Sequence, residues 1–165
     1  MLIHFDATTH AAPLTADQSR GVLEFCRAAG ATVFTVNFLY VKGEDSERLA
    51  QQFYHRLAAY FGGDRVLENV RGARFSLQRC WLLDNRSIEC ILNETGGNLF
   101  AYNMLVLPED WLFYVGNSIL LQVVSSEQEA TLRLSEEQYA AFRELGIPHE
   151  PGCPQWSGLP EAPRK

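Results

Sequence analysis

The sequence contains few cysteines, and they lie far apart. Cys26, Cys80, Cys90 and Cys153 show no C-x-x-C spacing, so the usual pattern of a zinc site or a dithiol redox centre is absent. A chain of 165 residues buries roughly two thirds of its unfolded surface, which is enough to hold a core together without disulfides. We therefore expect four free thiols in a reducing compartment, and no metal.

Long hydrophobic runs are absent as well. No stretch approaches the roughly eighteen apolar residues that a membrane-spanning helix needs. Residues 1–15 have no basic start, and His4, Asp6 and His10 interrupt their apolar positions, which is unlike a secretory signal peptide. We therefore expect a cytoplasmic protein with no membrane role.

Motifs that bind phosphate or build a hydrolase site are also missing. The sequence has no G-x-S-x-G, no G-x-x-x-x-G-K and no G-x-G-x-x-G after a predicted strand. Its net charge of -6 argues against general binding to nucleic acid, because such binding neutralises phosphates with lysine and arginine. We expect no nucleic-acid partner, and no motif points to a cofactor.

The composition is that of a folded domain, with 47% hydrophobic and 21% charged residues. Alternating apolar positions predict strands at Leu2–Asp6 and Thr32–Val41, which we expect to pair with each other. From Phe75 onward the alternation of Leu77, Trp81 and Leu83 predicts another strand.

Helices are predicted from their start and stop signals. Thr15 and Gln18 have the spacing of a capping box, and Gly30 supplies a stop. A second helix is predicted from Ser46 to Phe61, where apolar residues recur every four positions. A stronger capping box at Ser135 begins the third helix.

The tract after Trp81 is predicted to be a strand meander that ends at Leu134. Asp84-Asn85 is interpreted as a hairpin turn into a strand at residues 87–92, with Trp81 opposite Ile88. Further strands are predicted at residues 99–107, 119–124 and 131–134, the first of them near the middle of the sheet. Trp111–Val115 follows a proline break, and its pattern is ambiguous.

Together these elements predict an α+β fold with a mostly antiparallel sheet, a C-terminal meander and about three helices packed on it. Residues 1–147 are predicted to form a single domain, although Gly62-Gly63 is the best place for a subdomain break. Residues 148–165 hold five of the seven prolines and are predicted to be a tail or strap.

Two groups of residues suggest chemistry, and each has a simpler explanation. His4, Asp6 and His10 have metal-ligand types at short spacing, but a histidine and an aspartate at a strand end explain the same letters. Positive charge collects at Arg65, Arg71, Arg74 and Arg79. These arginines suit a phosphate or an acidic partner, or they protect an edge strand from pairing with other chains.

The function that the sequence favours is a cytoplasmic protein-binding module that occupies a partner, as an inhibitor, immunity protein or antitoxin does. Carboxylates in the predicted turns lie beside two aromatic residues, an arrangement typical of an interface with a basic protein surface. The predicted partner-binding residues are Asp84, Glu94, Glu109, Asp110, Trp111 and Tyr114. Trp111 also fits a core position. The alternatives are an enzyme with a site around His4, Asp6 and His10, and a sensor with a small-molecule pocket between helices and sheet.

The thiols provide a first test. Because no pair has a redox or metal spacing, all four cysteines should react with a thiol reagent in denaturant without added reductant. Elemental analysis of the purified protein should find no stoichiometric zinc. Fewer than four reactive thiols, or one equivalent of metal, would contradict the prediction.

Overall fold

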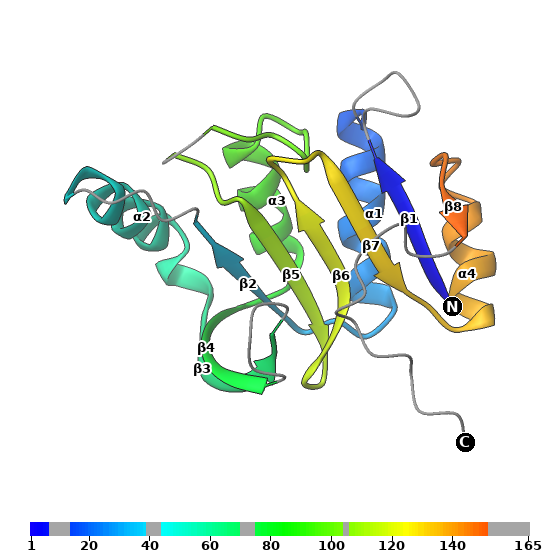
Figure 1. The fold of residues 1–165 in the computed structure, drawn as a ribbon, viewed down its shortest axis with the longest axis horizontal. Helices are drawn as coiled ribbons and strands as arrows, with labels where there is room; N and C mark the ends of the chain where they lie inside the picture. Colours follow the sequence, from blue (N-terminus) through cyan, green and yellow to red (C-terminus); the bar gives the residue numbers. More distant parts are fainter. Residues whose placement is uncertain (7–13, 39–43, 70–74, 104–105, 152–165) are drawn as a thin grey trace.

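The computed structural model describes residues 1–6, 14–38, 44–69, 75–103 and 106–151 (Figure 1). Within these ranges eight strands form one antiparallel sheet in the order β3-β4-β2-β5-β6-β7-β1-β8, together with four α-helices. The predicted α+β class with a mostly antiparallel sheet is confirmed. None of the helices in the described ranges is long and apolar enough to span a lipid bilayer.

The elements have the following bounds. The strands are β1 (Leu2–Asp6), β2 (Val33–Asn37), β3 (Phe61–Glu68), β4 (Phe75–Leu82), β5 (Asp110–Val115), β6 (Ser118–Val124), β7 (Glu129–Arg133) and β8 (Glu150–Pro151). The helices are α1 (Ala16–Ala28), α2 (Glu44–Arg56), α3 (Asn85–Glu94) and α4 (Glu136–Arg143), with a short 3-10 helix η1 (Ala58–Tyr60) after α2.

Residues that pair across neighbouring strands form rows, and the side chains of successive rows point to opposite faces of the sheet, as the pleat requires. The first inner row is Ile3, Leu132, Leu121, Phe113 and Phe34, and the second is Phe5, Ala130, Val123, Trp111 and Val36. All ten side chains belong to the main hydrophobic core. The row between them is largely polar, with His4, Thr131, Gln122, Leu112 and Thr35 on the other face.

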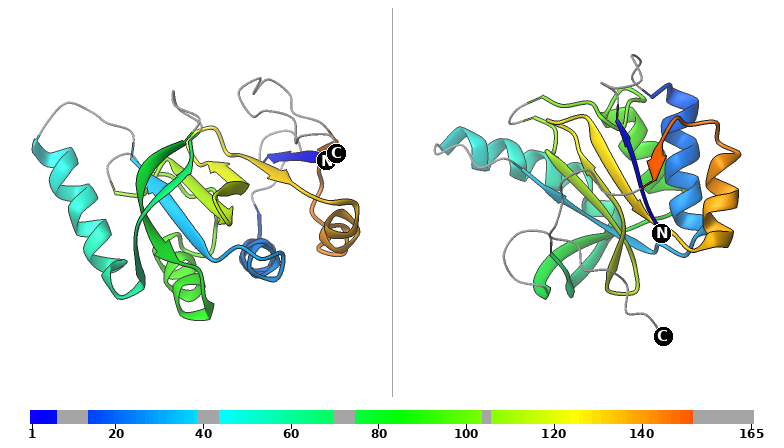
Figure 2. Two further views of the ribbon diagram at one scale, coloured as in Figure 1. Left: turned by 90° about the horizontal axis from the view of Figure 1, so that it is seen from below. Right: turned by 45° about the vertical axis from the view of Figure 1, so that its right-hand side comes forward.

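The helices cover the apolar face. Figure 2 shows α1, α3 and α4 on the same side of the sheet, whereas α2 lies beyond β2. Buried side chains such as Leu23 of α1, Ile91 of α3 and Phe142 of α4 pack into the main core with Phe53 of α2. Burying such side chains stabilises the fold by about 1.5–3 kcal/mol each before the entropy cost.

The two strongest sequence signals for helix starts are confirmed. Thr15 accepts a hydrogen bond from the Gln18 amide at 3.1 Å, and the Gln18 side chain accepts one from the Thr15 amide at 3.0 Å. Ser135 and Gln138 form the same reciprocal pair. Gly30 has the predicted left-handed conformation, with φ at 99°.

The end of the sheet at β3 curls toward β6. The Glu68 amide at the end of β3 donates to the Asn117 carbonyl at 2.9 Å, and the Glu68 carboxylate accepts from the Ile119 amide at 2.8 Å. The curl encloses a second apolar cluster, made of Val33, Leu67, Cys80, Leu112, Tyr114 and Ile119. The face opposite the main core is therefore also packed at this end.

The predicted hairpin at Asp84-Asn85 is wrong. Residues 85–94 form α3, and Asp84 caps it by accepting a hydrogen bond from the Ser87 amide at 2.8 Å. The buried residues Ile88, Ile91 and Leu92 recur at helical spacing. Trp81 therefore does not face Ile88 and is paired with Phe34 of β2 and Phe61 of β3.

Other strand predictions also fail. Residues 99–103 and 106–107 contain no strand, and Leu99 and Phe100 are buried within a turn. Strand β2 does not pair with β1 but lies between β4 and β5. Residues 61–68, expected to contain a helix end and a break, form β3. The ambiguous segment Trp111–Val115 is part of β5.

The proline-rich segment contributes one short strand. Glu150 and Pro151 form β8 and pair with His4 and Ile3 at the outer edge of β1. The predicted tail from residue 152 onward, with Cys153, lies outside the described residues, as does the end of the strand predicted to reach Val41.

Trp81 offers a test of the core. Its side chain is 2% exposed and stacks between Phe34 at 6.0 Å and Tyr54 at 5.3 Å. Trp81→Ala should lower the free energy of unfolding by about 3–5 kcal/mol, measured by chemical denaturation. The neighbouring Leu82 is 43% exposed, so Leu82→Ala should cost less than about 1 kcal/mol. Equal losses in the two variants would contradict the assignment of Trp81 to the core.

Candidate functional site

The two aromatic residues predicted to anchor a partner are part of the interior. Trp111 and Tyr114 are both 0% exposed. Trp111 packs against Phe34 at 6.2 Å and Phe53 at 5.9 Å between ring centroids. The prediction of surface anchors here is wrong, because the ambiguous segment is the central strand β5, covered on both faces.

The two acidic residues just before Trp111 are buried as well. Glu109 is 9% exposed and accepts a hydrogen bond from Ser126 Oγ at 3.0 Å. Asp110 is 1% exposed and accepts one from Asn37 Nδ2 at 3.3 Å. Their carboxylates bind within the protein instead of forming a charged rim, so this prediction is also wrong.

The remaining two acidic residues lie at opposite ends of α3. Asp84 caps its start, and Glu94 near its end receives a hydrogen bond from Arg56 Nε at 2.8 Å. A helix of ten residues separates them by about 15 Å. The six predicted residues therefore do not form one surface.

The structure describes only part of the histidine–aspartate group and part of the arginine cluster. His4 Nε2 lies 3.5 Å from Asp6 Oδ2, whereas His10 lies outside the described residues. No group of three or more metal-ligand side chains occurs in the part of the chain that the structure describes. Arg65 and Arg79 lie on β3 and β4 at the sheet edge, and the other two arginines of the cluster are not described.

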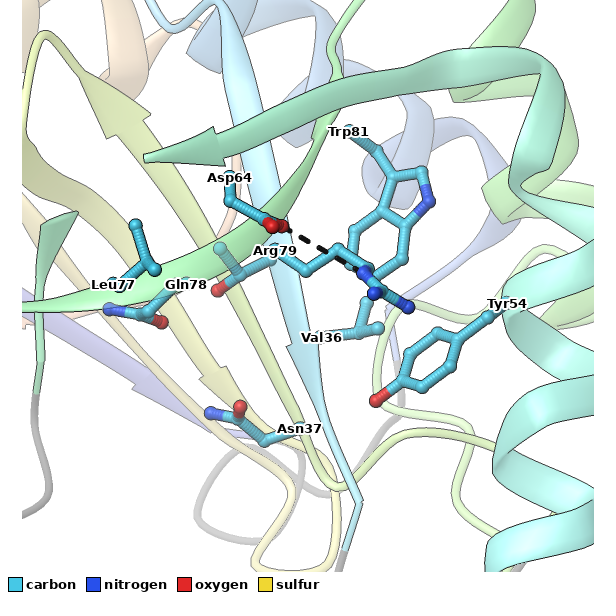
Figure 3. Close-up of a pocket in the computed structure, with 9 residues that line it drawn as sticks. Val36, Asn37, Tyr54, Asp64, Leu77, Gln78, Arg79 and Trp81 are labelled. Carbon is cyan, nitrogen blue, oxygen red and sulfur yellow. Dashed lines mark ion pairs between the residues drawn. The ribbon is translucent and has the colours of Figure 1, made fainter. Parts of the chain in front are cut away.

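One cavity opens where β2 and β4 separate. These strands pair at only two positions, Val33 with Leu82 and Phe34 with Trp81, and then diverge. The gap forms a pocket of ≈ 390 Å³, here called the β2–β4 pocket (Figure 3). It is lined by Thr35, Val36, Asn37, Tyr54, Asp64, Leu77, Gln78, Arg79 and Trp81.

Aromatic and charged groups meet in this pocket. Tyr54 of α2 stacks on Trp81 with ring centroids 5.3 Å apart and planes at 20°. Burial raises the pKa of the Tyr54 hydroxyl, against the opposing effect of Arg79, so the hydroxyl stays neutral and can donate. Arg79 Nε lies 3.9 Å from Asp64 Oδ1. The pocket thus combines an aromatic wall with one positively and one negatively charged side chain.

A second pocket adjoins the first and is more apolar. It has a volume of ≈ 340 Å³ and shares Tyr54, Arg79 and Trp81 with the β2–β4 pocket. Its other lining residues are Gln51, His55, Ala58 and Phe61. Both volumes lie near the lower end of the range for small-molecule sites, about 300–1,000 Å³.

The outer surface of β3 and β4 is apolar. Leu77 is 70% exposed, Val66 is 55% exposed and Phe75 is 45% exposed. Val66 and Leu77 are cross-strand neighbours, and Phe75 precedes Leu77 by two residues, on the same side of β4. We call these three residues the hairpin patch.

Hydrogen bonds hold the far end of this hairpin, where β3 ends at Glu68, in place. Arg133 Nη1 lies 3.2 Å from Glu68 Oε2, and Tyr114 Oη donates to the Glu68 carbonyl at 3.1 Å. With the Ile119 amide, these groups fix the end of β3 from three directions. The strand that carries Val66 of the hairpin patch is therefore held in place at one end.

The chain matches no protein-family model, no curated protein and no solved structure. The fold and the cavities alone define its class, an α+β protein with a curled antiparallel sheet, a small-molecule-sized pocket and an apolar edge hairpin.

Part of the region formed by β3 and β4 can be recognised from the sequence. The alternation from Phe75 to Trp81 identifies β4, and the arginine cluster lies near the correct edge. Asp64 and Val66 were missed because Gly62-Gly63 is typical of a loop. In the structure Gly63 has φ at 91°, and the register of β3 and β4 shifts between Phe61 and Gly63.

The raised pKa of the Tyr114 hydroxyl leads to a prediction of how the free energy of unfolding depends on pH. Burial raises the pKa of its hydroxyl to about 12, whereas in an unfolded chain a tyrosine has a pKa of about 10. The folded state therefore holds this proton at higher pH than the unfolded state. Its contribution to stability is complete below pH ~10 and is lost between pH ~10 and ~12, by about 2–3 kcal/mol in total.

Chemical denaturation of Tyr114→Phe between pH 8 and 12 tests this point. The variant should be about 1 kcal/mol less stable at pH 8, because it lacks a hydrogen bond, yet it should lose less stability as the pH rises. Thr35→Val is the matched control: it removes the hydroxyl 3.4 Å from Tyr114 Oη and keeps the ionisable group. An alkaline decline in Tyr114→Phe equal to that of the wild type would contradict the assignment.

Proposed function

We propose that this protein is a protein-binding module that docks an extended segment of a partner protein against the hairpin patch. One observation carries the proposal. Of the eight large hydrophobic side chains that are exposed within the described ranges, five belong to β3 and β4. Exposed apolar side chains gathered on one element are typical of interaction sites, whereas single scattered ones are not.

The backbone of β3 supports docking by strand addition. β3 is the outermost strand on its side of the sheet. The amide of Glu68 points away from β4, because it donates to Asn117. Hydrogen-bonding directions alternate along an antiparallel strand, so the amide and carbonyl of Val66 and Asp64 also point outward. These groups are suited to pairing with an extended partner segment.

The charge of the hairpin favours an acidic segment. Between Asp64 and Arg79 the sequence contains four arginines and two carboxylates, and one of these, Glu68, is already bound by Arg133. A partner strand with apolar residues facing Val66 and acidic residues at its flanks fits this balance. The basic partner expected from the sequence depended on carboxylates that include Glu109 and Asp110, which are buried.

Charge also argues against a second copy of this chain as the occupant. Two copies of β3 paired around a two-fold axis place each residue opposite one on the same face. A pair centred on Asp64 or on Arg65, the middle residues of the strand, sets two like charges directly opposite each other, which is destabilising. We therefore propose a different protein as partner.

We further propose that docking neutralises the partner by occupying its segment, as an inhibitor, immunity protein or antitoxin does, and that this takes place in the cytoplasm. Cys26, Cys80 and Cys90 are free thiols, which fits a reducing compartment. Burial raises the pKa of the Cys26 thiol, so this cysteine is suited to a structural position and not to catalysis.

Comparative affinity purification tests the docking site. The double variant Val66→Glu, Leu77→Glu places negative charge in the hairpin patch, where it would repel an acidic segment, and both positions are more than half exposed, so the fold should persist. A partner recovered stoichiometrically with the wild type should be absent with this variant. With that partner purified, its affinity should fall at least about thirty-fold, the effect of losing ~2 kcal/mol.

Val115→Glu is the matched control, because Val115 is also a strand valine, is 39% exposed and lies outside β3 and β4. It should retain the partner. Retention of the partner by the double variant would overturn the docking site. Sedimentation that shows a wild-type dimer and a monomeric double variant would identify a second copy as the occupant and overturn the proposal of a different partner.

A further inference from the structure

Two opposite charges line the β2–β4 pocket without forming a close ion pair. Asp64 and Arg79 are cross-strand neighbours, and their nearest charged atoms are 3.9 Å apart (Figure 3). Their side chains are 51% and 54% exposed. A pair this open contributes little to stability, so both groups remain able to bind a ligand.

The rest of the pocket is suited to an apolar group with a polar end. Val36, Leu77 and the stacked rings of Tyr54 and Trp81 form the apolar wall. Asn37 and Gln78 also line the pocket, but their side-chain amides already donate hydrogen bonds, Asn37 to Asp110 and Gln78 to the Glu68 carbonyl. The ladder between β2 and β4 stops after Phe34 and Trp81, so the pocket lies beside strand segments that are not paired with each other.

The charge arrangement selects among ligand classes. A simple carboxylate bound to Arg79 would lie close to the Asp64 carboxylate and be repelled by it. A simple ammonium ion bound to Asp64 would lie close to the Arg79 guanidinium and be repelled in the same way. A ligand with both groups on one carbon atom satisfies both side chains, and charge-assisted hydrogen bonds of this kind are the stronger ones.

We propose that the β2–β4 pocket binds a free α-amino acid with an aromatic side chain. Its carboxylate binds Arg79, its ammonium group binds Asp64, and its ring packs against Tyr54 and Leu77. A flat aromatic wall favours an aromatic ring through offset stacking. The pocket shares Leu77 with the hairpin patch and takes Asp64 from β3. Its ligand binds through side chains of the pocket and needs no partner strand, so titration of the protein alone tests it independently of partner docking.

Isothermal titration calorimetry with three probes tests the ligand class on the wild-type protein. L-phenylalanine carries both charges, 3-phenylpropanoate lacks the ammonium group, and 2-phenylethylamine lacks the carboxylate. L-phenylalanine should bind saturably with a Kd below about 1 mM. Each analogue should bind at least about tenfold more weakly, because one charged side chain loses its partner. Binding of either analogue as tight as that of L-phenylalanine would overturn the proposal, as would no saturable binding of L-phenylalanine below about 10 mM.

Variants locate the site. Asp64→Asn and Arg79→Gln should each weaken L-phenylalanine binding at least about tenfold. Arg65→Gln is the control, because Arg65 is an exposed residue of the same strand that does not line the pocket, and it should bind L-phenylalanine as the wild type does. Equal weakening in all three variants would overturn the assignment. If a pocket variant fails to fold, the comparison of the three probes on the wild type still decides the ligand class.

Discussion

The curled end of the sheet depends on one buried carboxylate. Glu68 is 5% exposed, and its oxygens accept hydrogen bonds from the Ile119 amide and the Arg133 guanidinium. An ionised carboxylate without partners in the interior would be strongly destabilising. The end of β3 is therefore held beside β6 and β7, although three other strands lie between β3 and β6 in the sheet order. Tyr114 reinforces the contact from the central strand β5.

This constraint accounts for both proposed binding features. Because Glu68 holds the far end of the hairpin against β6, β4 cannot follow β2 along its whole length, and the two strands pair at only two positions. The separation leaves the β2–β4 pocket open between them. Val66 and Leu77 lie on the same side of the hairpin as Trp81, but they are exposed and lie outside the main core that the helices cover. A pocket and an apolar edge are thus two results of one packing arrangement.

Local signals predicted much of the fold, and the failures have local causes too. The capping boxes at Thr15 and Ser135 depend on side-chain hydrogen bonds to nearby amides, so they can be recognised without tertiary information. Asp84 and Ser87 form an equivalent pair, but Ile88, Cys90 and Leu92 also alternate, and the prediction followed the shorter period. The predicted partner-binding surface failed because several of its residues are buried. The local sequence does not distinguish Glu109 and Asp110, which are enclosed by the fold, from solvated turn carboxylates. The approach of β3 to β6 could not be predicted either, because it depends on contacts that are distant in sequence.

The position of β1 has a consequence for how the chain folds. Ile3 pairs with Leu132, ~130 residues later in the sequence, and His4 pairs with Glu150 on the opposite side. During synthesis at ~5–20 residues per second, β1 therefore waits on the order of ten seconds for its neighbours to be made. Contacts between such distant segments slow folding, because a long loop must close before they form. The curled half of the sheet, from β2 to β6, needs no residue from β1 for its strand pairing. Assembly in the order of translation would thus begin at the end that carries the pocket and finish with the strand made first.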